Sequence, residues 1–185
     1  MADRAKRNGS KPQRQLVLGG RRMIAAYRVP ELQPETKGPW SVEPDKVAWV
    51  DPDTGMACIV RRNPEGHLSG FVGIAESHPL YGYTADAIPA DAVDVPGGID
   101  YAEPCDETGP EERSVCHIRV LGGGDVWWVG MSCNRIDDLV PGDPGHAHEA
   151  QRLGIGQTYR DIHEVVGRCG DLARQLKRLV AEGEC

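Results

Sequence analysis

The sequence has no run of apolar residues that approaches the roughly 18 needed for a membrane-spanning helix. Its first 15 residues, MADRAKRNGSKPQRQ, are basic and lack the apolar core of a secretory signal. Of its 185 residues, 39% are hydrophobic and 26% are charged, a balance that suits one globular domain. We therefore expect a soluble cytoplasmic protein that does not contact a membrane.

The common nucleotide-binding and hydrolytic motifs are also missing. There is no phosphate loop of the form G-x-x-x-x-G-K-S/T, no G-x-G-x-x-G, no G-x-S-x-G and no H-E-x-x-H. No C-x-x-C pair is present, which disfavours a zinc ribbon or finger, and six cysteines are too few for a disulfide-stapled scaffold. The sequence thus predicts reduced, mostly buried thiols, and it favours a binding protein over an enzyme without excluding the latter.

Positive charge is scarce outside the first 28 residues. These residues hold eight Arg or Lys side chains against one acidic residue, whereas the whole chain has a net charge of −7. The body is therefore acidic, and a nucleic-acid-binding domain would normally be basic because phosphate contacts supply most of its non-specific affinity. The sequence therefore allows binding to a nucleic acid only as a weak contact through residues 1–28.

The composition divides the chain into three parts. Residues 1–15 form a basic arm that we expect to be disordered, residues 16–42 form a Pro-rich wrapping segment, and residues 43–182 form a single α+β domain. Two turn signals between residues 46 and 74 predict a three-strand meander, and the runs SVCHIRVL and DVWWVGMSC around G-G-G-D predict a further hairpin. Residues 75–112 predict a long irregular segment and residues 141–156 a loop.

The C-terminal segment has the apolar spacing of an amphipathic helix that begins near Thr158. Thr158 and Asp161 resemble a capping box, and Gly167 and Gly170 weaken the helix, so that it needs packing to persist. The apolar residues recur three or four positions apart: Ile162, Val165, Cys169, Leu172, Leu176 and Leu179. We predict a mixed, mostly antiparallel sheet with this helix packed on one face, which is an α+β fold.

The candidate ligand-binding residues flank the expected strands. Histidine and tyrosine can move protons or bind ligands, one of the adjacent tryptophans should face outward to stack on a flat ring, and an arginine fork suits phosphate or carboxylate. Neighbouring side chains of a strand point to opposite faces, so the Cys- and His-rich group around Cys116 does not predict a metal site, and the cofactor stays unknown. The set is His78, Tyr81, Asp106, Trp127, Trp128, Cys133, Arg135 and Asp138.

Seven segments together resemble an uncharacterised family found in phages, prophages and other bacteria. They are GHLSGFVGI, HPLYG, DVPGGIDY, PCD, VWWVGMSC, DL-V-P and YRDIHEV, and the resemblance covers about residues 57–180. The corresponding family segments read approximately G-H-L-C-G-Y-V, H-P-L-Y-G, V-H-G-G-L-T-Y, W-W-x-G-F-D-C-A-H-x-x-D and Y-R-D-x-x-Y-V. The resemblance implies kinship, with no established activity attached to it.

Three departures from that pattern fall at the residue types best suited to metal ligation or acid–base chemistry. This chain has Pro96 in place of His, Ser132 in place of Asp, and Arg135 in place of His. If the family is enzymatic, we expect this member to have lost the chemistry and kept a binding pocket, in which Arg135 offers a fixed positive fork.

The sequence therefore supports three hypotheses. The first is a non-catalytic phage or mobile-element accessory protein of the host cytoplasm, which binds a small anionic, nucleotide-like ligand or a host protein, with counter-defence as a conceivable role. The second is a metal-dependent or Cys/His hydrolase that uses His78, Tyr81, Asp106, Cys133 and Asp138. The third is a nucleic-acid partner that acts through the basic arm. The oligomeric state is left open.

Overall fold

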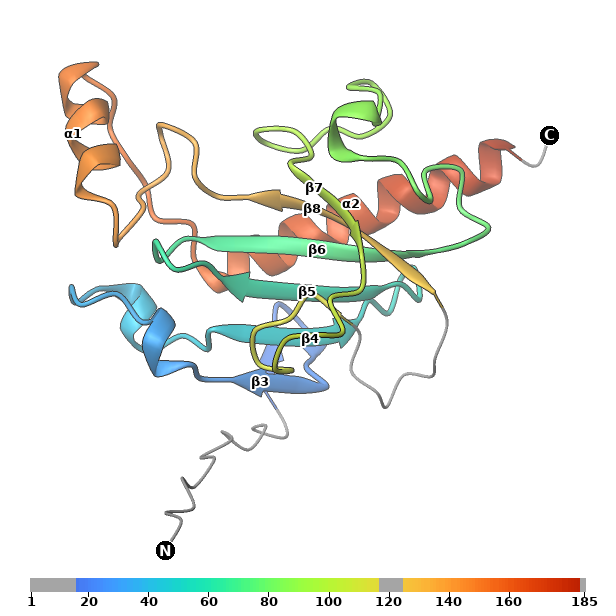
Figure 1. Ribbon diagram of the computed structural model, residues 1–185, viewed down its shortest axis with the longest axis horizontal. Coiled ribbons are helices and arrows are strands. Elements are labelled where there is room, and N and C mark those ends of the chain that lie inside the picture. Colours follow the sequence, from blue (N-terminus) through green and yellow to red (C-terminus); the bar gives the residue numbers. More distant parts are fainter. Residues whose placement is uncertain (1–15, 117–124, 184–185) are drawn as a thin grey trace, which may run out of the picture.

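The computed structural model describes residues 16–116 and 125–183, and its main feature is a six-stranded antiparallel sheet. In chain order the sheet strands are β3 (Ala25–Tyr27), β4 (Lys46–Val50), β5 (Ala57–Arg62), β6 (Leu68–Ala75), β7 (Tyr101–Pro104) and β8 (Val126–Ser132). They lie side by side in the order β3-β4-β5-β6-β8-β7 (Figure 1). A separate two-stranded hairpin is formed by β1 (Val17–Leu18) and β2 (Arg21–Arg22).

The predicted meander is confirmed as β4, β5 and β6. The first turn is closed by the Asp51 carboxylate, which accepts hydrogen bonds from the backbone N–H (3.2 Å) and the hydroxyl (2.9 Å) of Thr54. In the second turn Gly66 adopts φ +91°, a conformation that disfavours side chains. Both turns are tight enough to pair the strands residue by residue.

Helix α2 (Ile162–Gly183) packs on one face of the sheet, as the apolar spacing predicted (Figure 1). Five of the six predicted apolar positions are fully buried, and Leu179 packs partly buried at the end of the row. The helix approaches β6 closely at Gly70, where an added Cβ would lie 2.5 Å from Sγ of Cys169. The α+β architecture that the sequence predicted is therefore present.

The opposite face of the sheet has its own small core. Ile59, Phe71 and Trp128 from the sheet pack there with Tyr27 and with Val115 from the segment that follows β7. That segment crosses in front of the sheet, whereas α2 lies behind it (Figure 1). Both faces of the sheet are thus covered.

A buried charge network joins the wrapping segment, the sheet and α2. Arg62 is fully buried and donates from Nε to Asp45 (2.7 Å) and from Nη2 to Glu43 (3.0 Å). Glu43 also accepts from Tyr159 Oη (2.6 Å) and from the backbone N–H of Ile162 (3.0 Å), so it caps the start of α2. Every charge here has a partner, which marks the network as structural.

Several expectations are corrected in detail. Residues Pro144–Arg152 form helix α1 and not a loop, because Asp143 accepts a hydrogen bond from the His146 N–H (3.0 Å) as its N-cap. Helix α2 begins at Ile162, after the Asp161 side chain accepts from Glu164 N–H (2.9 Å), while Thr158 pairs with Asp138 in a β-bridge.

Two further findings concern the middle of the chain. Strand β8 pairs with β6 and β7, whereas most of the other expected arm of the hairpin, residues 117–121, lies outside the described residues. Cys105 and Cys116 form a disulfide, whereas Cys58, Cys133 and Cys169 are free and buried as expected.

Short helices η1 (Pro30–Leu32) and η2 (Pro39–Ser41) lie in the wrapping segment, and η3 (Ala85–Ala87) lies in the irregular segment after β6. Strand β3 belongs to residues 16–42, so that segment supplies one edge of the sheet. The expected basic arm, residues 1–15, lies outside the described residues. No helix in the described ranges is long and apolar enough to cross a membrane.

Candidate functional site

The predicted site residues fall into separate regions of the fold. His78, Tyr81 and Trp127 lie beside one end of β8, and Cys133, Arg135 and Asp138 follow its other end. Since β8 has seven residues and a strand rises about 3.4 Å per residue, these groups are roughly 20 Å apart. A single small ligand therefore cannot contact both ends.

The His78 end is a packing site. Nδ1 of His78 accepts from the Leu80 N–H (3.1 Å), so the proton lies on Nε2, which donates to the carbonyl of Leu176 (2.9 Å). Burial lowers the pKa of His78, which favours the neutral ring that these two bonds require. Both ring nitrogens are occupied, and the imidazole pins the segment after β6 to α2.

Tyr81 and Trp127 form an aromatic contact beside it. Their ring centroids are 5.8 Å apart, and Nε1 of Trp127 donates to the Tyr83 carbonyl (3.0 Å). Trp127 is half-buried in this contact. The pair holds the start of the irregular segment against β8.

Trp128 and Asp106 belong to the other face of the sheet. Trp128 is fully buried, and its Nε1 lies 3.4 Å from Sγ of Cys105. Asp106 is exposed and accepts from the backbone and hydroxyl of Thr108, which lowers the pKa of its carboxyl. Neither residue faces the other predicted site residues.

The turn after β8 is built around the buried carboxylate of Asp138. This side chain accepts from the Arg135 N–H (3.0 Å) and from Nε of Arg160 (2.6 Å). Nε2 of His146, from the first turn of α1, donates to the carbonyls of Arg135 (2.9 Å) and Asp138 (3.0 Å). These bonds fix the backbone that carries Arg135. The two arginines of this turn region, Arg135 and Arg160, are paired with the carboxylates of Asp137 and Asp138.

Arg135 is presented by close packing on a glycine. Gly97 has φ +89°, and an added Cβ would lie 3.1 Å from Cδ of Arg135, so the arginine stem takes the place of a side chain at residue 97. The Arg135 side chain is 46% exposed, and within the described residues its guanidinium has one carboxylate partner, Asp137, at 3.4 Å. By comparison, the ion pair of Arg160 with Asp138 is 2.6 Å long and largely buried. The stem of Arg135 is thus fixed by packing, whereas its ion pair with Asp137 is long and weak.

His67 is a buried histidine of this region with an unused ring nitrogen. The residue is 7% exposed, and among residues 16–116 and 125–183 its enclosed Nδ1 finds no hydrogen-bond partner. Burial lowers its pKa, while Asp100 and Asp138 act in the opposite direction and His146 in the same one. A neutral imidazole with one free nitrogen can donate to or accept from a ligand. We define His67, Gly97, Arg135, Asp138 and His146 as the Arg135 cluster.

Cys133 lies next to this cluster, in a setting that disfavours a nucleophilic thiolate. Burial raises the pKa of its thiol to about 12, despite the attraction of Arg168, whose Nη1 lies 3.7 Å from Sγ. The side chain is 2% exposed in the core under α2. Its side chain therefore contributes to packing. Arg168 donates a hydrogen bond to the Glu164 carboxylate (2.6 Å).

Ser132 and Pro96, two of the three residues that differ from the resembled pattern, lie near this end of the sheet. Ser132 shares a hydrogen bond with Ser69 across β6 and β8, with their hydroxyl oxygens 2.8 Å apart, and Nδ2 of Asn63 donates to Ser69 (2.7 Å). Pro96 directly precedes Gly97, on which Arg135 packs. No base is bonded to either serine in the described residues, so the pair has no activated nucleophile.

Sequence reasoning identified Arg135 and Asp138 but not the rest of the cluster. His67, Gly97 and His146 come from three other segments, and no local spacing relates them to residue 135. The Gly97-Gly98 pair was the available signal, because adjacent glycines after a proline mark a backbone that must turn and be approached closely.

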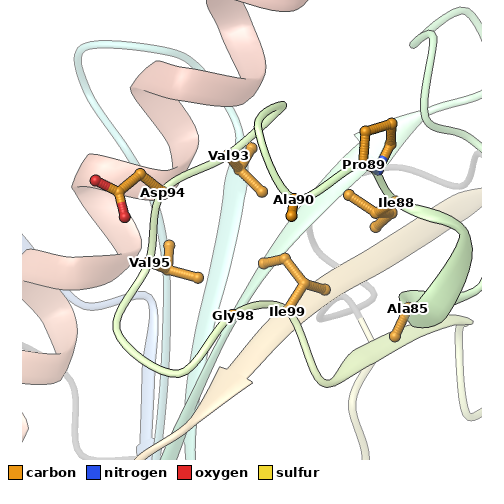
Figure 2. Close-up of a pocket in the computed structure, with 9 residues that line it drawn as sticks. All are labelled: Ala85, Ile88, Pro89, Ala90, Val93, Asp94, Val95, Gly98 and Ile99. Carbon is orange, nitrogen blue, oxygen red and sulfur yellow. The ribbon is translucent and has the colours of Figure 1, made fainter.

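A small apolar pocket lies in the irregular segment, apart from the predicted residues. Its volume is about 220 Å³, below the roughly 300–1,000 Å³ of most ligand pockets. Figure 2 shows Ile88, Val93, Val95 and Ile99 converging on one centre, with the Asp94 carboxylate turned away. The side chains that line it are mostly aliphatic, and polar atoms make up the rest of the wall.

Within residues 16–116 and 125–183 there is no group of three His, Cys, Asp or Glu side chains that could hold a metal ion. Comparisons with protein-family models, with curated proteins and with solved structures find no match. The candidate site therefore depends on the geometry of the Arg135 cluster.

Proposed function

We propose that the protein is a non-catalytic binding protein, and that the Arg135 cluster holds an anionic group of its ligand. The observation that carries the proposal is the state of Arg135. Its stem packs against Gly97, its side chain is about half exposed, and within the described residues it makes one ion pair of 3.4 Å. An incoming carboxylate or phosphate can replace Asp137 with a bidentate contact of better geometry.

His67 supports the same proposal. An enclosed ring nitrogen without a partner among the described residues costs free energy in the folded protein, and a ligand hydroxyl or N–H that displaced the atoms covering it would recover part of that energy. The turn that carries Arg135 is fixed by Asp138 and His146, so little ordering is needed when a ligand binds.

The ligand that fits is small and need not contain an aromatic base. The expectation of a nucleotide-like ligand paired Arg135 with ring stacking on Trp127 or Trp128, but Trp128 is buried and Trp127 lies at the far end of β8. A compact carboxylate or phosphate requires only the Arg135 end. A host protein that offers such a group on its surface satisfies the same chemistry.

The setting that we propose follows from the family resemblance. A phage or mobile-element accessory protein would meet this ligand or host protein in the cytoplasm of the host cell, where counter-defence is one conceivable role. The hydrolase alternative has less support, because its five residues lie in separate regions and the Cys133 thiol is held in its neutral form. Most of the basic residues behind the nucleic-acid alternative lie outside the described residues.

Calorimetric titration with inorganic phosphate and with succinate tests the proposal. We expect saturable binding of at least one probe below ~10 mM, and a loss of about tenfold or more in affinity for Arg135→Ala. Arg152→Ala is the matched control, because Arg152 is an exposed arginine of α1 that also pairs with a carboxylate. Equal affinity of Arg135→Ala and the unmodified protein, or no binding of either probe, contradicts the proposal.

A further inference from the structure

The Cys105–Cys116 disulfide closes a loop that crosses the face of the sheet opposite α2 (Figure 1). We name residues 105–116 the strap. It begins directly after β7, at one edge of the sheet, and extends as far as β3 and β4 near the other edge. Val115 fixes it to the apolar core of that face, where it is 1% exposed.

In four hydrogen bonds between described residues of the strap and the sheet, the sheet is the donor. The Glu111 carboxylate accepts from Tyr27 Oη (2.9 Å), and the Glu111 carbonyl accepts from Nζ of Lys46. The carbonyl of Arg113 accepts from Nη1 of Arg61 (2.9 Å). Sγ of Cys105 also lies 3.4 Å from Nε1 of Trp128, so the strap supplies the acceptors for these four donors of the sheet.

The face under the strap combines two cations with apolar surface. Lys46 is fully buried, 5.8 Å from the ring centroid of Tyr27, and Arg61 lies 5.6 Å from the ring centroid of Phe71. In the described part of the chain Lys46 makes no ion pair with a carboxylate. Burial lowers the pKa of Lys46 to about 8, which reflects a cation held without full compensation.

The strap itself has the composition of an acidic peptide. Its sequence, CDETGPEERSVC, contains four carboxylates and one arginine. An acidic segment with one apolar anchor thus lies on a face that offers two cations, a phenol and buried aliphatic and aromatic side chains. Such complementarity is what an acidic partner peptide would need on the same face.

We infer that the sheet face under the strap is a second binding surface, which fits an acidic segment of a partner protein and which the strap occupies while its disulfide is closed. This surface is separate from the Arg135 cluster and does not depend on the function proposed for it.

Reduction of the disulfide releases the strap. A dithiol reductant transfers two electrons and two protons, the S–S bond breaks, Cys105 and Cys116 become thiols, and the reductant becomes a disulfide. The chain still joins the strap to β7 and β8, but Cys105 and Cys116 no longer hold its two ends together, so only its non-covalent contacts keep it on the sheet. The Glu111 carboxylate and two carbonyls of the strap then compete with a partner's acidic segment for the same donors.

Amine acylation of Lys46 tests the release of the strap. The oxidised and reduced proteins are treated with an acylating reagent at pH 8, and modification of each lysine is measured by mass spectrometry. We expect the Lys46 modification rate to rise by about tenfold or more on reduction, relative to exposed Lys37 as the internal control. An unchanged ratio of Lys46 to Lys37 overturns the inference.

Binding to the exposed face is tested with a peptide of residues 105–116 in which both cysteines are serine. The receptor is the full chain with Cys105→Ser, Cys116→Ser and Val115→Asp, because the buried aspartate prevents its own strap from docking. We expect saturable binding below ~1 mM to this variant and none to the oxidised protein.

Circular dichroism and cooperative urea unfolding of the variant serve as the folding control. Loss of the cooperative transition, equal peptide binding to both forms, or no binding to the folded variant each overturns the inference. Phosphate and succinate titrations should be the same in both redox states, so failure here and failure of the Arg135 proposal are distinguishable.

Discussion

Arg62 carries the charge network at the centre of the molecule. Substitution to methionine would leave Glu43 and Asp45 buried without their cation, and we expect the free energy of unfolding to fall by ~3–5 kcal/mol. Urea denaturation measures this loss. Arg152→Met, which removes an exposed ion pair with Glu149, is the control and should leave the unfolding midpoint unchanged. A loss below ~1 kcal/mol for Arg62→Met would show that the network is dispensable.

Two buried histidines make stability depend on acidity. Burial lowers the pKa of His67 and of His78 below the ordinary value of 6.5. As pH falls below 6.5 the unfolded chain takes up protons at both residues and the folded chain does not, so the folded state loses stability. We expect the free energy of unfolding to decrease from pH 6.5 to pH 5, and His78→Gln to make this decrease smaller. A value that is constant or rises over this range contradicts the assignment of neutral, buried rings.

At the scale of elements, two glycines predict opposite outcomes. Gly70 lets α2 approach β6, and Gly70→Ala would press a methyl group against Cys169, for an expected loss of ~1–3 kcal/mol. Gly167 lies within α2 with no atom near its absent side chain, so Gly167→Ala should raise stability by up to ~1 kcal/mol through helix propensity. Thermal unfolding of both variants checks the pair. Equal effects of the two substitutions would show that α2 does not seat on β6 at Gly70.

The elements that were predicted from sequence are those with a strong local signal. Strands β4 to β6 have apolar runs between recognisable turns, and α2 has a regular apolar stripe. Helix α1 was missed because it is nine residues long, begins with Pro-Gly and buries only Ala150. Strand β3 has three residues and exists by pairing with β4, which no local pattern can indicate.

At the scale of the whole molecule, the sequence predicted candidate residues better than it predicted which of them lie close together in the fold. Arg135 was predicted from its departure from the family pattern, and the structure places it in one turn with Asp138. Trp127 was grouped with Arg135 although it lies near the opposite end of β8. His67 and Gly97 reach the same place from distant segments, through a topology that inserts β8 between β6 and β7. The Cys105–Cys116 pairing likewise needed the path of the strap across the sheet.

The most direct test of the account is a nitrogen-15 NMR titration of the protein with inorganic phosphate, which follows the Arg135 guanidinium, the His67 imidazole and the backbone amides of Gly97 and Gly98. We predict saturable shifts at these signals and their loss in Arg135→Ala, while Arg152 stays unperturbed. Shifts spread evenly over exposed arginines, or the same shifts at His67 in Arg135→Ala, would contradict an anion site at the Arg135 cluster.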